Sequence, residues 1–341
     1  MKIGLVGYQG SGKSTLFEWL TGVAPDPAAS HVEQSAMAPI PEPRVEALCG
    51  VYHPKKVTHA SLEIVDTPGL ARSHEGNAAR LGLIREAGCL VLVVSALDGA
   101  DPKRDLASFE EDLILADMDI VCRRVERLQE SVAKPRPNRD EELAELAALE
   151  PLQATLESGQ SLLEAEMSDE QRRVIRSFRL LTEKPRLTVV NLPDTEDHAE
   201  RFADIAAEGE PVLAAPLGLE LELARMDEPD RAEFEEELQI ATPRRDEFLR
   251  AMMDASRQFV FFTAGDQEVR AWLFPVGGTA VEAAGGIHTD LARGFIRAEV
   301  MRCEDLVRLG SEREIKAHNL MRQEHKDYVV QDDDILLIRH N

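Results

Sequence analysis

Cysteines are few in this sequence, and their spacing excludes the familiar metal and redox motifs. The 341 residues include four cysteines, and no two of them stand in a CxxC pair. Structural zinc sites and dithiol redox centres need closely spaced pairs. We therefore expect neither kind of site, and we expect the four side chains to be reduced thiols. They are Cys49, Cys89, Cys122 and Cys303.

Long apolar runs are also missing. The chain opens with MKIGLVGYQGSGKST, which has no apolar stretch of the length that a signal peptide requires. No later segment approaches the ~18 consecutive apolar residues of a membrane-spanning helix. We therefore expect a cytoplasmic protein with no membrane partner.

Basic residues are in the minority. The chain has 39 Lys and Arg against 63 Asp and Glu, which gives a formal net charge of -24. Such a surface repels phosphate backbones, so strong generic nucleic-acid binding is not expected. Hydrophobic residues at 43% and charged residues at 30% are ordinary for a globular protein. The length is sufficient for two or three domains.

Short apolar runs alternate with helical stretches in the first and middle parts of the chain. Residues 89–97 (CLVLVVSAL) form a continuous apolar run, which is typical of a central parallel strand. A helix is predicted over residues 14–21, and residues 24–43, rich in Pro and Ala, are predicted to be an irregular loop. This alternation favours an α/β fold, a doubly wound and mainly parallel sheet. The predicted strands are residues 2–7, 61–66, 89–97, 187–191 and 211–215.

The strand pattern is interrupted over residues 109–181. Apolar residues there recur at steps of four and three, as in a coiled coil. The segment KPRPN at residues 134–138 breaks the helix, and a second apolar series follows. We interpret the region as an antiparallel helical hairpin, with two ordinary core helices as the alternative. The first series is Ile114, Met118, Val121, Val125, Leu128 and Val132, and the second is Leu156, Leu163, Met167, Val174, Phe178 and Leu181.

The last part of the chain has a different pattern. Residues 259–341 contain four strand-like runs around one helical stretch at about 279–292, which predicts a small α+β domain. The sequence therefore predicts three parts. A discontinuous sheet domain comprises residues 1–108 and 182–258, the hairpin spans 109–181, and the α+β domain follows.

A phosphate-binding loop is the strongest motif. Residues 7–14 (GYQGSGKS) match GxxxxGKS, and the match lies between a predicted strand and a predicted helix, as the motif requires. Glycines allow successive backbone N–H groups to curl around phosphates, and the helix N-terminus adds a favourable dipole. Lys13 is predicted to reach the β- and γ-phosphates and Ser14 to ligate Mg²⁺. The predicted nucleotide-binding residues of this loop are Gly7, Gln9, Gly10, Ser11, Gly12, Lys13, Ser14 and Thr15.

A second motif, DTPG at residues 66–69, follows the predicted strand 61–66. The Asp66 carboxylate is predicted to hold Mg²⁺ directly or through water. The backbone N–H of Gly69 is predicted to contact the γ-phosphate, which would make the following loop a nucleotide-sensitive switch. We therefore assign catalytic roles to Lys13 and Gly69 and metal binding to Ser14 and Asp66.

The position after this glycine lacks the usual water-orienting residue. Small GTPases carry Gln there, whereas this chain has Leu70, which cannot polarise water. Either another group orients the water or hydrolysis is slow. His74 and Glu75 lie in the same loop and are candidates, although exposed loop residues more often have no such role.

A third motif is of the kind that recognises the base of a bound nucleotide. Residues 191–194 (NLPD) match the outer positions of NKxD, with Leu192 in place of lysine. An Asp carboxylate can accept hydrogen bonds from the two N–H groups of guanine. We assign Asn191, Leu192 and Asp194 to nucleotide binding; the alternative is a simple turn at the end of a strand.

With these motifs in place, the chain resembles the YchF family, a branch of the Obg-related GTPases, nearly end to end. The similarity is strongest in FFTAGDQEVRAWLFPVGGTAVEAAGGIHTDLARGFIRAEV and KDYVVQDDDI, and it extends to EEDLILADMDIVCRRVERL, LIREAG and PEPR. The resemblance implies a G domain, a helical hairpin and a C-terminal TGS domain with a β-grasp fold. It also implies Mg²⁺-dependent hydrolysis of ATP or GTP, association with ribosomes, and a role in translation or stress.

Some positions differ from the family pattern. Gly10 replaces the Asn that is tied to potassium-assisted hydrolysis, so the resemblance does not extend a potassium requirement to this chain. DTPG replaces the usual DIAG, and the glycine-rich switch after it is shorter. Asp194 replaces the family's Glu, which shifts the site toward guanine, while Leu70 is shared. The switch-one hydroxyl aligns with Ser30.

These observations favour a slow nucleoside triphosphatase that acts as a nucleotide-controlled switch. A nucleotide-binding regulatory module with negligible hydrolysis is one alternative. An RNA- or ribosome-binding scaffold is the other. The sequence does not decide between ATP and GTP.

Overall fold

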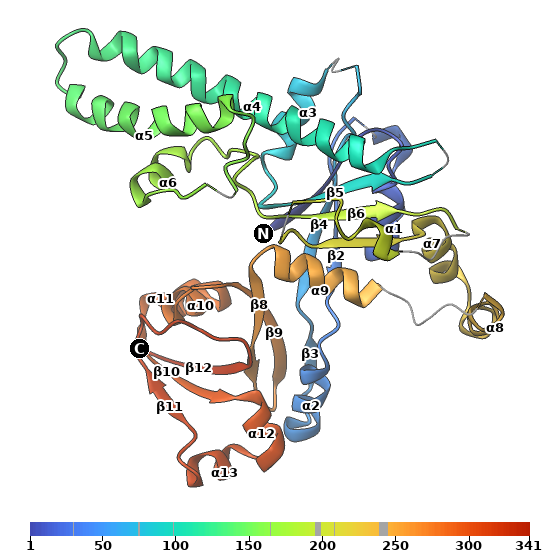
Figure 1. The fold of residues 1–341 in the computed structure, drawn as a ribbon. Helices are drawn as coiled ribbons and strands as arrows, with labels where there is room; N and C mark the ends of the chain where they lie inside the picture. The colour runs from blue at the N-terminus through green and yellow to red at the C-terminus, as the bar shows by residue number, and fades with distance from the viewer. Residues whose placement is uncertain are drawn as a thin grey trace. The chain divides into compact units, whose positions relative to one another are not determined.

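The computed structural model describes residues 1–29, 31–73, 76–97, 99–163, 165–194, 199–207, 209–238 and 245–341. The chain forms two compact units (Figure 1). The first comprises Met1–Ala36 and Glu63–Arg245, and the second comprises Met37–Leu62 and Asp246–Asn341. The division into three domains drawn from the sequence stays a prediction. Within the described ranges, none of the helices combines the length and apolar character that a membrane crossing needs.

A six-stranded sheet in the order β2-β4-β1-β5-β6-β7 organises the first unit. The pairs β1–β4, β1–β5, β5–β6 and β6–β7 are all parallel. Every residue of β5 and β6 is buried, as expected for strands covered on both faces. The predicted doubly wound α/β fold is therefore confirmed. The strands are β1 (Lys2–Val6), β2 (Gln34–Pro39), β4 (Ser61–Asp66), β5 (Cys89–Ser95), β6 (Arg186–Asn191) and β7 (Val212–Ala215).

Strand β2 corrects the expectation of an irregular loop over residues 24–43. Its sequence, QSAMAP, contains no β-branched or aromatic residue, so local propensity does not favour a strand. Its place at the edge of the sheet beside β4 supplies the backbone hydrogen bonds that make it one.

Helices cover both faces of this sheet. On one face, α3 and α4 pack against alternate residues of the strands, with Ile84, Phe109 and Leu113 fully or almost fully buried. Helix α1 contacts β1 and α7. Because successive strand residues point to opposite faces, both layers are apolar. The helices are α1 (Lys13–Thr21), α3 (Asn77–Ile84), α4 (Pro102–Val132), α7 (Leu217–Arg225) and α8 (Glu228–Leu238), with short 3₁₀ turns at Pro27–Ala29 and Ala199–Phe202.

The predicted helical hairpin is present, with different limits (Figure 1). Helix α4 begins at Pro102, where the Asp101 side chain accepts a hydrogen bond from Arg104 N. Its second half packs along α5 (Arg139–Glu157), and Val125 and Leu152 are buried between them. The return arm is not one helix to residue 181, because α5 ends at Glu157 and only the short α6 (Asp169–Ile175) follows.

Buried Asp117 ties the hairpin to the sheet layer. Its Oδ1 accepts a hydrogen bond of 2.6 Å from Arg85 Nη1. Its Oδ2 accepts bonds of 2.7 and 2.8 Å from the backbone N and Oγ1 of Thr182. Asp117 is 0% exposed, so these hydrogen bonds and the charge of Arg85 take the place of water around its carboxylate.

The second unit contains another six-stranded sheet, in the order β11-β10-β12-β8-β9-β3. Its apolar core includes Phe261, Phe274 and Val300. Strand β3 comes from the segment between the first two nucleotide motifs and pairs in parallel with β9. The strands are β3 (Lys56–Thr58), β8 (Gln258–Ala264), β9 (Glu268–Pro275), β10 (Phe295–Arg302), β11 (Arg322–Glu324) and β12 (Asp334–His340).

The helices of this unit exceed the single stretch expected at 279–292. That stretch is divided at His288, whose backbone is extended, into two helices. Two further helices, α12 and α13, are short, lie between β10 and β11, and were not expected from the sequence. The helices are α2 (Pro43–Tyr52), α9 (Arg245–Ala255), α10 (Ala280–Ile287), α11 (Thr289–Arg293), α12 (Cys303–Leu309) and α13 (Glu312–Ala317).

The substitution Asp117→Ala should lower the free energy of unfolding by about 3–5 kcal/mol, because it leaves the Arg85 guanidinium without its buried counter-charge. Asp119→Ala is the matched control on the same helix, since the Asp119 side chain is 53% exposed, and it should change stability by less than ~0.5 kcal/mol. Urea denaturation measures both. Equal effects of the two substitutions would contradict the anchoring role of Asp117.

Candidate nucleotide-binding site

The loop between β1 and α1 has the backbone that the glycine motif predicts. Gly7, Gly10 and Gly12 have φ angles of 145°, 80° and 103°, a region that glycine adopts without strain. A Cβ on Gly7 would lie 2.4 Å from the carbonyl oxygen of Val93. A Cβ on Gly12 would lie 2.5 Å from Asn191 Nδ2. At Gly7 and Gly12, the loop therefore leaves no room for a side chain.

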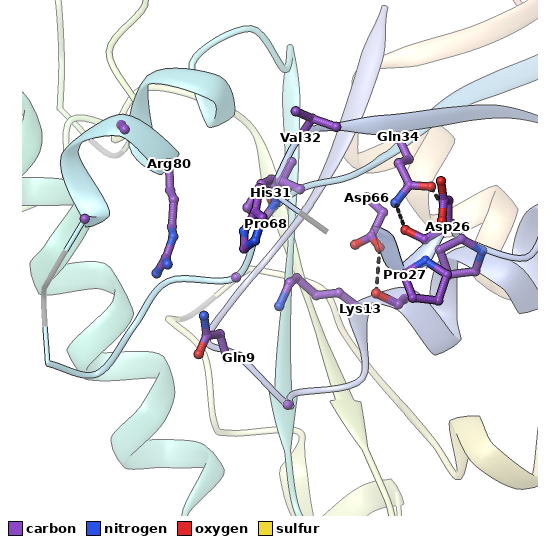
Figure 2. A pocket seen from close by; sticks show the side chains of 17 residues that line it. Gln9, Lys13, Asp26, Pro27, His31, Val32, Gln34, Asp66, Pro68 and Arg80 are labelled. Carbon is purple, nitrogen blue, oxygen red and sulfur yellow. Dashed lines mark hydrogen bonds between the residues drawn. The ribbon is translucent and has the colours of Figure 1, made fainter. Parts of the chain in front are cut away.

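This loop borders a cavity of about 550 Å³ that lies wholly within the first unit (Figure 2). Of the predicted loop residues, four line it: Gln9, Gly10, Lys13 and Ser14. Gly7, Ser11, Gly12 and Thr15 belong to the same loop and helix start but are not among its described lining residues. The rest of the lining comes from Asp66, Thr67, Pro68 and Gly69, from Pro25, Asp26, Pro27, His31, Val32 and Gln34, and from Gly76, Ala79 and Arg80.

Lys13 lies at the centre of this cavity wall. Its side chain is almost fully buried at 6% exposure, and its Nζ donates a 2.8 Å hydrogen bond to the carbonyl oxygen of Tyr8. Burial lowers the pKa of Lys13 to about 8, and the nearby charge of Asp66 only partly opposes this. The ammonium group is thus held where an anionic ligand would stabilise its charged form.

Ser14 and Asp66 meet as the two motifs predict. Ser14 Oγ donates a 2.6 Å hydrogen bond to Asp66 Oδ2. Asp66 Oδ1 is buried and has no hydrogen-bond partner among the described residues. Burial raises the pKa of Asp66, against the effects of Ser14 and Lys13.

These oxygens fit a magnesium ion bound together with nucleotide. The described residues include no cluster of three or more His, Cys, Asp or Glu side chains that could hold a metal by themselves. Mg²⁺ in nucleotide sites is held by one or two protein oxygens, with phosphates and water as its other ligands. Ser14 Oγ and the unpartnered Asp66 Oδ1 supply oxygens of the required kind.

The residues after DTPG are docked onto the phosphate-binding loop by backbone hydrogen bonds. Gln9 N donates to Leu70 O at 3.0 Å, and Leu70 N donates to Gly7 O at 3.1 Å. The Leu70 side chain is 0% exposed and belongs to the core that also contains Tyr8. A Cβ on Gly69 would lie 2.8 Å from Lys13 Nζ, so a side chain would crowd the lysine.

The three residues assigned to the base occupy different environments, and none is among the described lining residues of the cavity. Asn191 links the phosphate-binding loop to the start of α7, because its Nδ2 donates to Ser11 O and its Oδ1 accepts from Leu217 N, both at 3.3 Å. Leu192 is fully buried in the core below α4. Asp194 is exposed, and its Oδ1 accepts from Leu219 N at 3.3 Å. Their part in base recognition stays a prediction.

Comparisons with known proteins give the chain its family. Residues 2–124 match the family model MMR_HSR1, described as "50S ribosome-binding GTPase", and residues 259–341 match YchF-GTPase_C, described as "Protein of unknown function (DUF933)". "Ribosome-binding ATPase YchF" of Haemophilus influenzae is 33% identical over 362 residues, covering 100% of this chain and 99% of that protein. The chain belongs to the YchF family.

Other relatives and one solved structure agree. The Bacillus subtilis protein of the same name is 32% identical and covers 99% of this chain and 98% of its own length. "Obg-like ATPase 1" of Oryza sativa subsp. japonica is 34% identical, covering 100% and 92%. The YchF GTPase structure of Schizosaccharomyces pombe superimposes with a TM-score of 0.86 at 25% identity, covering 99% of this chain and 97% of that one.

The structure of this YchF chain adds cavity residues that sequence reasoning missed. Gln34 holds the loop before β2, because its Oε1 accepts from Asp26 N at 2.7 Å and its Nε2 donates to Asp26 O at 3.1 Å. His31 and Arg80 reach the cavity from that loop and from α3. These residues belong to no recognisable sequence motif. They come together only because the fold places their separate segments around one cavity. Ser30, His74 and Glu75 lie outside the described residues.

The lowered pKa of Lys13 predicts proton uptake on nucleotide binding. With a pKa of about 8 in the free protein, Lys13 is about half protonated at pH 8, and bound phosphates favour its charged form. We expect uptake of about half a proton at pH 8 and weaker binding as pH rises above 8. Calorimetry with a non-hydrolysable analogue in buffers of different ionisation enthalpy measures the uptake. Lys13→Arg keeps the positive charge at all these pH values and should abolish the proton uptake. Equal uptake in both proteins would contradict the assignment of the uptake to Lys13.

Proposed function

We propose that this chain is a Mg²⁺-dependent nucleoside triphosphatase that hydrolyses ATP or GTP slowly and acts as a nucleotide-controlled switch. One observation carries the proposal. Lys13, Ser14, Asp66 and Gly69, which come from two separate motifs, line a single cavity in the first unit. Membership of a family whose relatives are named ATPases or GTPases supports it.

The residues of the cavity have complementary tasks in this proposal. Lys13 Nζ exchanges its bond with Tyr8 O for contacts with the β- and γ-phosphates. The glycine-rich backbone offers N–H groups to the same phosphates. Ser14 and Asp66 would hold a Mg²⁺ ion, whose positive charge would offset the charge developing on the phosphate oxygens. The Gly69 N–H contacts the γ-phosphate.

Slow turnover follows from the position of Leu70. Its side chain is apolar and completely buried, so it can neither polarise nor orient a water molecule. The same observation favours the second candidate function, a nucleotide-binding regulatory module with negligible hydrolysis. The two candidates differ only in rate, and a turnover measurement separates them.

The switch has a structural route to the hairpin. Arg72, three residues after Gly69, forms a 2.5 Å ion pair with Asp105 of α4, and its guanidinium lies over the Tyr8 ring at 5.1 Å from the centroid. Tyr8 OH donates a 3.0 Å hydrogen bond to Asp112 of the same helix. Movement of the segment after Gly69 would therefore change the contacts of α4, and α4 extends into the hairpin.

We propose the ribosome as the partner that reads this state. Relatives with 32–33% identity over nearly the whole chain are named ribosome-binding ATPases. The net charge of -24 disfavours an RNA scaffold that binds through generic charge attraction.

The substitution Lys13→Ala should abolish phosphate release from both ATP and GTP, because the cavity loses its buried ammonium group. Phosphate release under saturating nucleotide and Mg²⁺ measures this, with Arg123→Ala as an exposed control on α4 that should match the unmodified protein. Turnover that persists in Lys13→Ala would belong to another site. Turnover absent from both proteins, with nucleotide binding intact, would establish the regulatory module instead.

Ribosome binding should depend on nucleotide and on Arg72. We expect more protein to cosediment with ribosomes in the presence of a non-hydrolysable triphosphate than with the diphosphate. Arg72→Ala should reduce that difference without weakening nucleotide binding, whereas Arg104→Ala, an exposed neighbour on α4, should not. Sedimentation through a sucrose cushion measures both. Binding to naked RNA with a steep salt dependence, and none to ribosomes, would favour the scaffold.

A further inference from the structure

We propose that Arg80 is a catalytic residue that contacts the γ-phosphate and stabilises the charge that develops there during hydrolysis. The inference rests on the proposed triphosphatase function and deepens it. Arg80 lies on α3 and extends into the cavity (Figure 2). Among the described lining residues, Lys13 and Arg80 are the two with cationic side chains other than histidine.

The charge of the cavity shows why a second cation matters. The described lining contains two carboxylates, Asp26 and Asp66, while a nucleoside triphosphate adds roughly four negative charges, of which Mg²⁺ neutralises two. Lys13 is the other cation of this lining, and its Nζ is already engaged by the carbonyl oxygen of Tyr8 at 2.8 Å. A guanidinium remains protonated under all ordinary conditions and presents planar N–H donors that match phosphate oxygens.

Arg80 is attached to the switch through Asn77. Asn77 is 5% exposed. Its Oδ1 accepts a 2.8 Å bond from Ala71 N, and its Nδ2 donates a 2.9 Å bond to Ala71 O. Arg80 Nη1 donates a 3.4 Å bond to the same Asn77 Oδ1. Ala71 follows Gly69 by two residues. A shift of the backbone at Gly69 would therefore be transmitted to Arg80 through the Ala71–Asn77 and Asn77–Arg80 hydrogen bonds.

A guanidinium has five N–H donors, so Arg80 can keep its bond to Asn77 while it binds phosphate. Figure 2 shows the Arg80 side chain directed from α3 into the space that Gln9 and Lys13 border. Arg80 and Lys13 therefore approach the cavity from two different elements, α3 and α1. A γ-phosphate bound between them would receive positive charge from both.

The step itself is a simple displacement. A water oxygen forms a bond to the γ-phosphorus while the bond from that phosphorus to the β–γ bridging oxygen breaks, and the electron pair stays on the diphosphate. The water loses a proton to a phosphate oxygen or to solvent, and the products are the nucleoside diphosphate and inorganic phosphate. Arg80 takes no proton. Its charge is most stabilising when negative charge accumulates on the γ-oxygens and the bridging oxygen.

This role compensates in part for Leu70. The buried leucine cannot orient the attacking water, so the rate depends on charge stabilisation from the remaining groups. Arginines that act this way contribute roughly 10³–10⁵-fold to kcat in other phosphoryl-transfer enzymes. Because this chain lacks the water-orienting glutamine, we expect the lower part of that range.

The test compares Arg80→Ala with Arg80→Lys in the full chain. Arg80→Ala should lower kcat by about 10³-fold and change KM by less than about threefold, while Arg80→Lys should retain an intermediate kcat. The nucleoside diphosphate should bind Arg80→Ala normally, but aluminium tetrafluoride should no longer tighten that binding, because the fluoride complex mimics the transferring phosphoryl group. Arg123→Ala is the exposed control and should behave like the unmodified protein.

A second variant addresses positioning. Asn77→Ala should lower kcat in the same direction, and the double variant with Arg80→Ala should be no slower than Arg80→Ala alone, because both changes act through one guanidinium. Circular dichroism and thermal unfolding establish that each variant is folded.

The outcomes separate this inference from the function on which it rests. Unchanged kcat in Arg80→Ala, or unchanged tightening by aluminium tetrafluoride, would overturn the role of Arg80 while leaving the triphosphatase intact. A change in KM alone would also overturn it, since Arg80 would then bind only the ground state. If Lys13→Ala retains full turnover, the proposed function fails, whatever Arg80 does.

Discussion

The backbone pairing of Leu70 with the phosphate-binding loop is the interaction on which the rest of the site depends. The backbone of Leu70 donates a hydrogen bond to Gly7 and accepts one from Gln9. Its side chain is buried in the same core cluster as Tyr8. A buried leucine is an anchor whose removal would leave a cavity, so its position is held firmly. This places Gly69 against Lys13 and Ala71 against Asn77.

The same anchor limits the chemistry. A residue that is buried for packing cannot also reach a water molecule in the cavity, so the position that orients water in small GTPases serves structure here. The cavity compensates with charge. Lys13 is buried with a lowered pKa, and the buried Asp66 Oδ1 has no hydrogen-bond partner among the described residues. Each such group costs roughly 1–3 kcal/mol until something binds it. Lys13 and Asp66 both line the cavity, so a bound ligand can reach them there.

The hairpin is connected to this site by polar contacts along α4. Near the start of the helix, Asp105 and Asp112 contact Arg72 and Tyr8. Five residues beyond Asp112, Asp117 binds Arg85 and the segment that leads into β6. A rigid helix transmits a displacement at its base over its whole length, so contacts that differ between nucleotide states at one end can alter the position of the other.

Several features could be read directly from the sequence because they depend on local spacing. The glycine motif sets the loop between β1 and α1, since the required φ angles and the helix start are encoded within eight residues. A continuous apolar run identifies β5, because a strand that is buried on both faces has few positions for polar side chains. The step of four and three identifies the hairpin, although the end of α5 at Glu157 does not follow from the apolar series.

Other features were decided only by the tertiary structure, because they depend on partners distant in the chain. Strand β2 is formed by pairing with β4, against the propensity of its own sequence. Strand β3 joins the sheet of the second unit, although it lies between two motifs of the first. Arg80 has no motif around it, and its place in the cavity follows from the packing of α3 and from the contacts of Asn77. Local sequence specifies backbone geometry and burial, whereas the fold determines which distant side chains share one cavity.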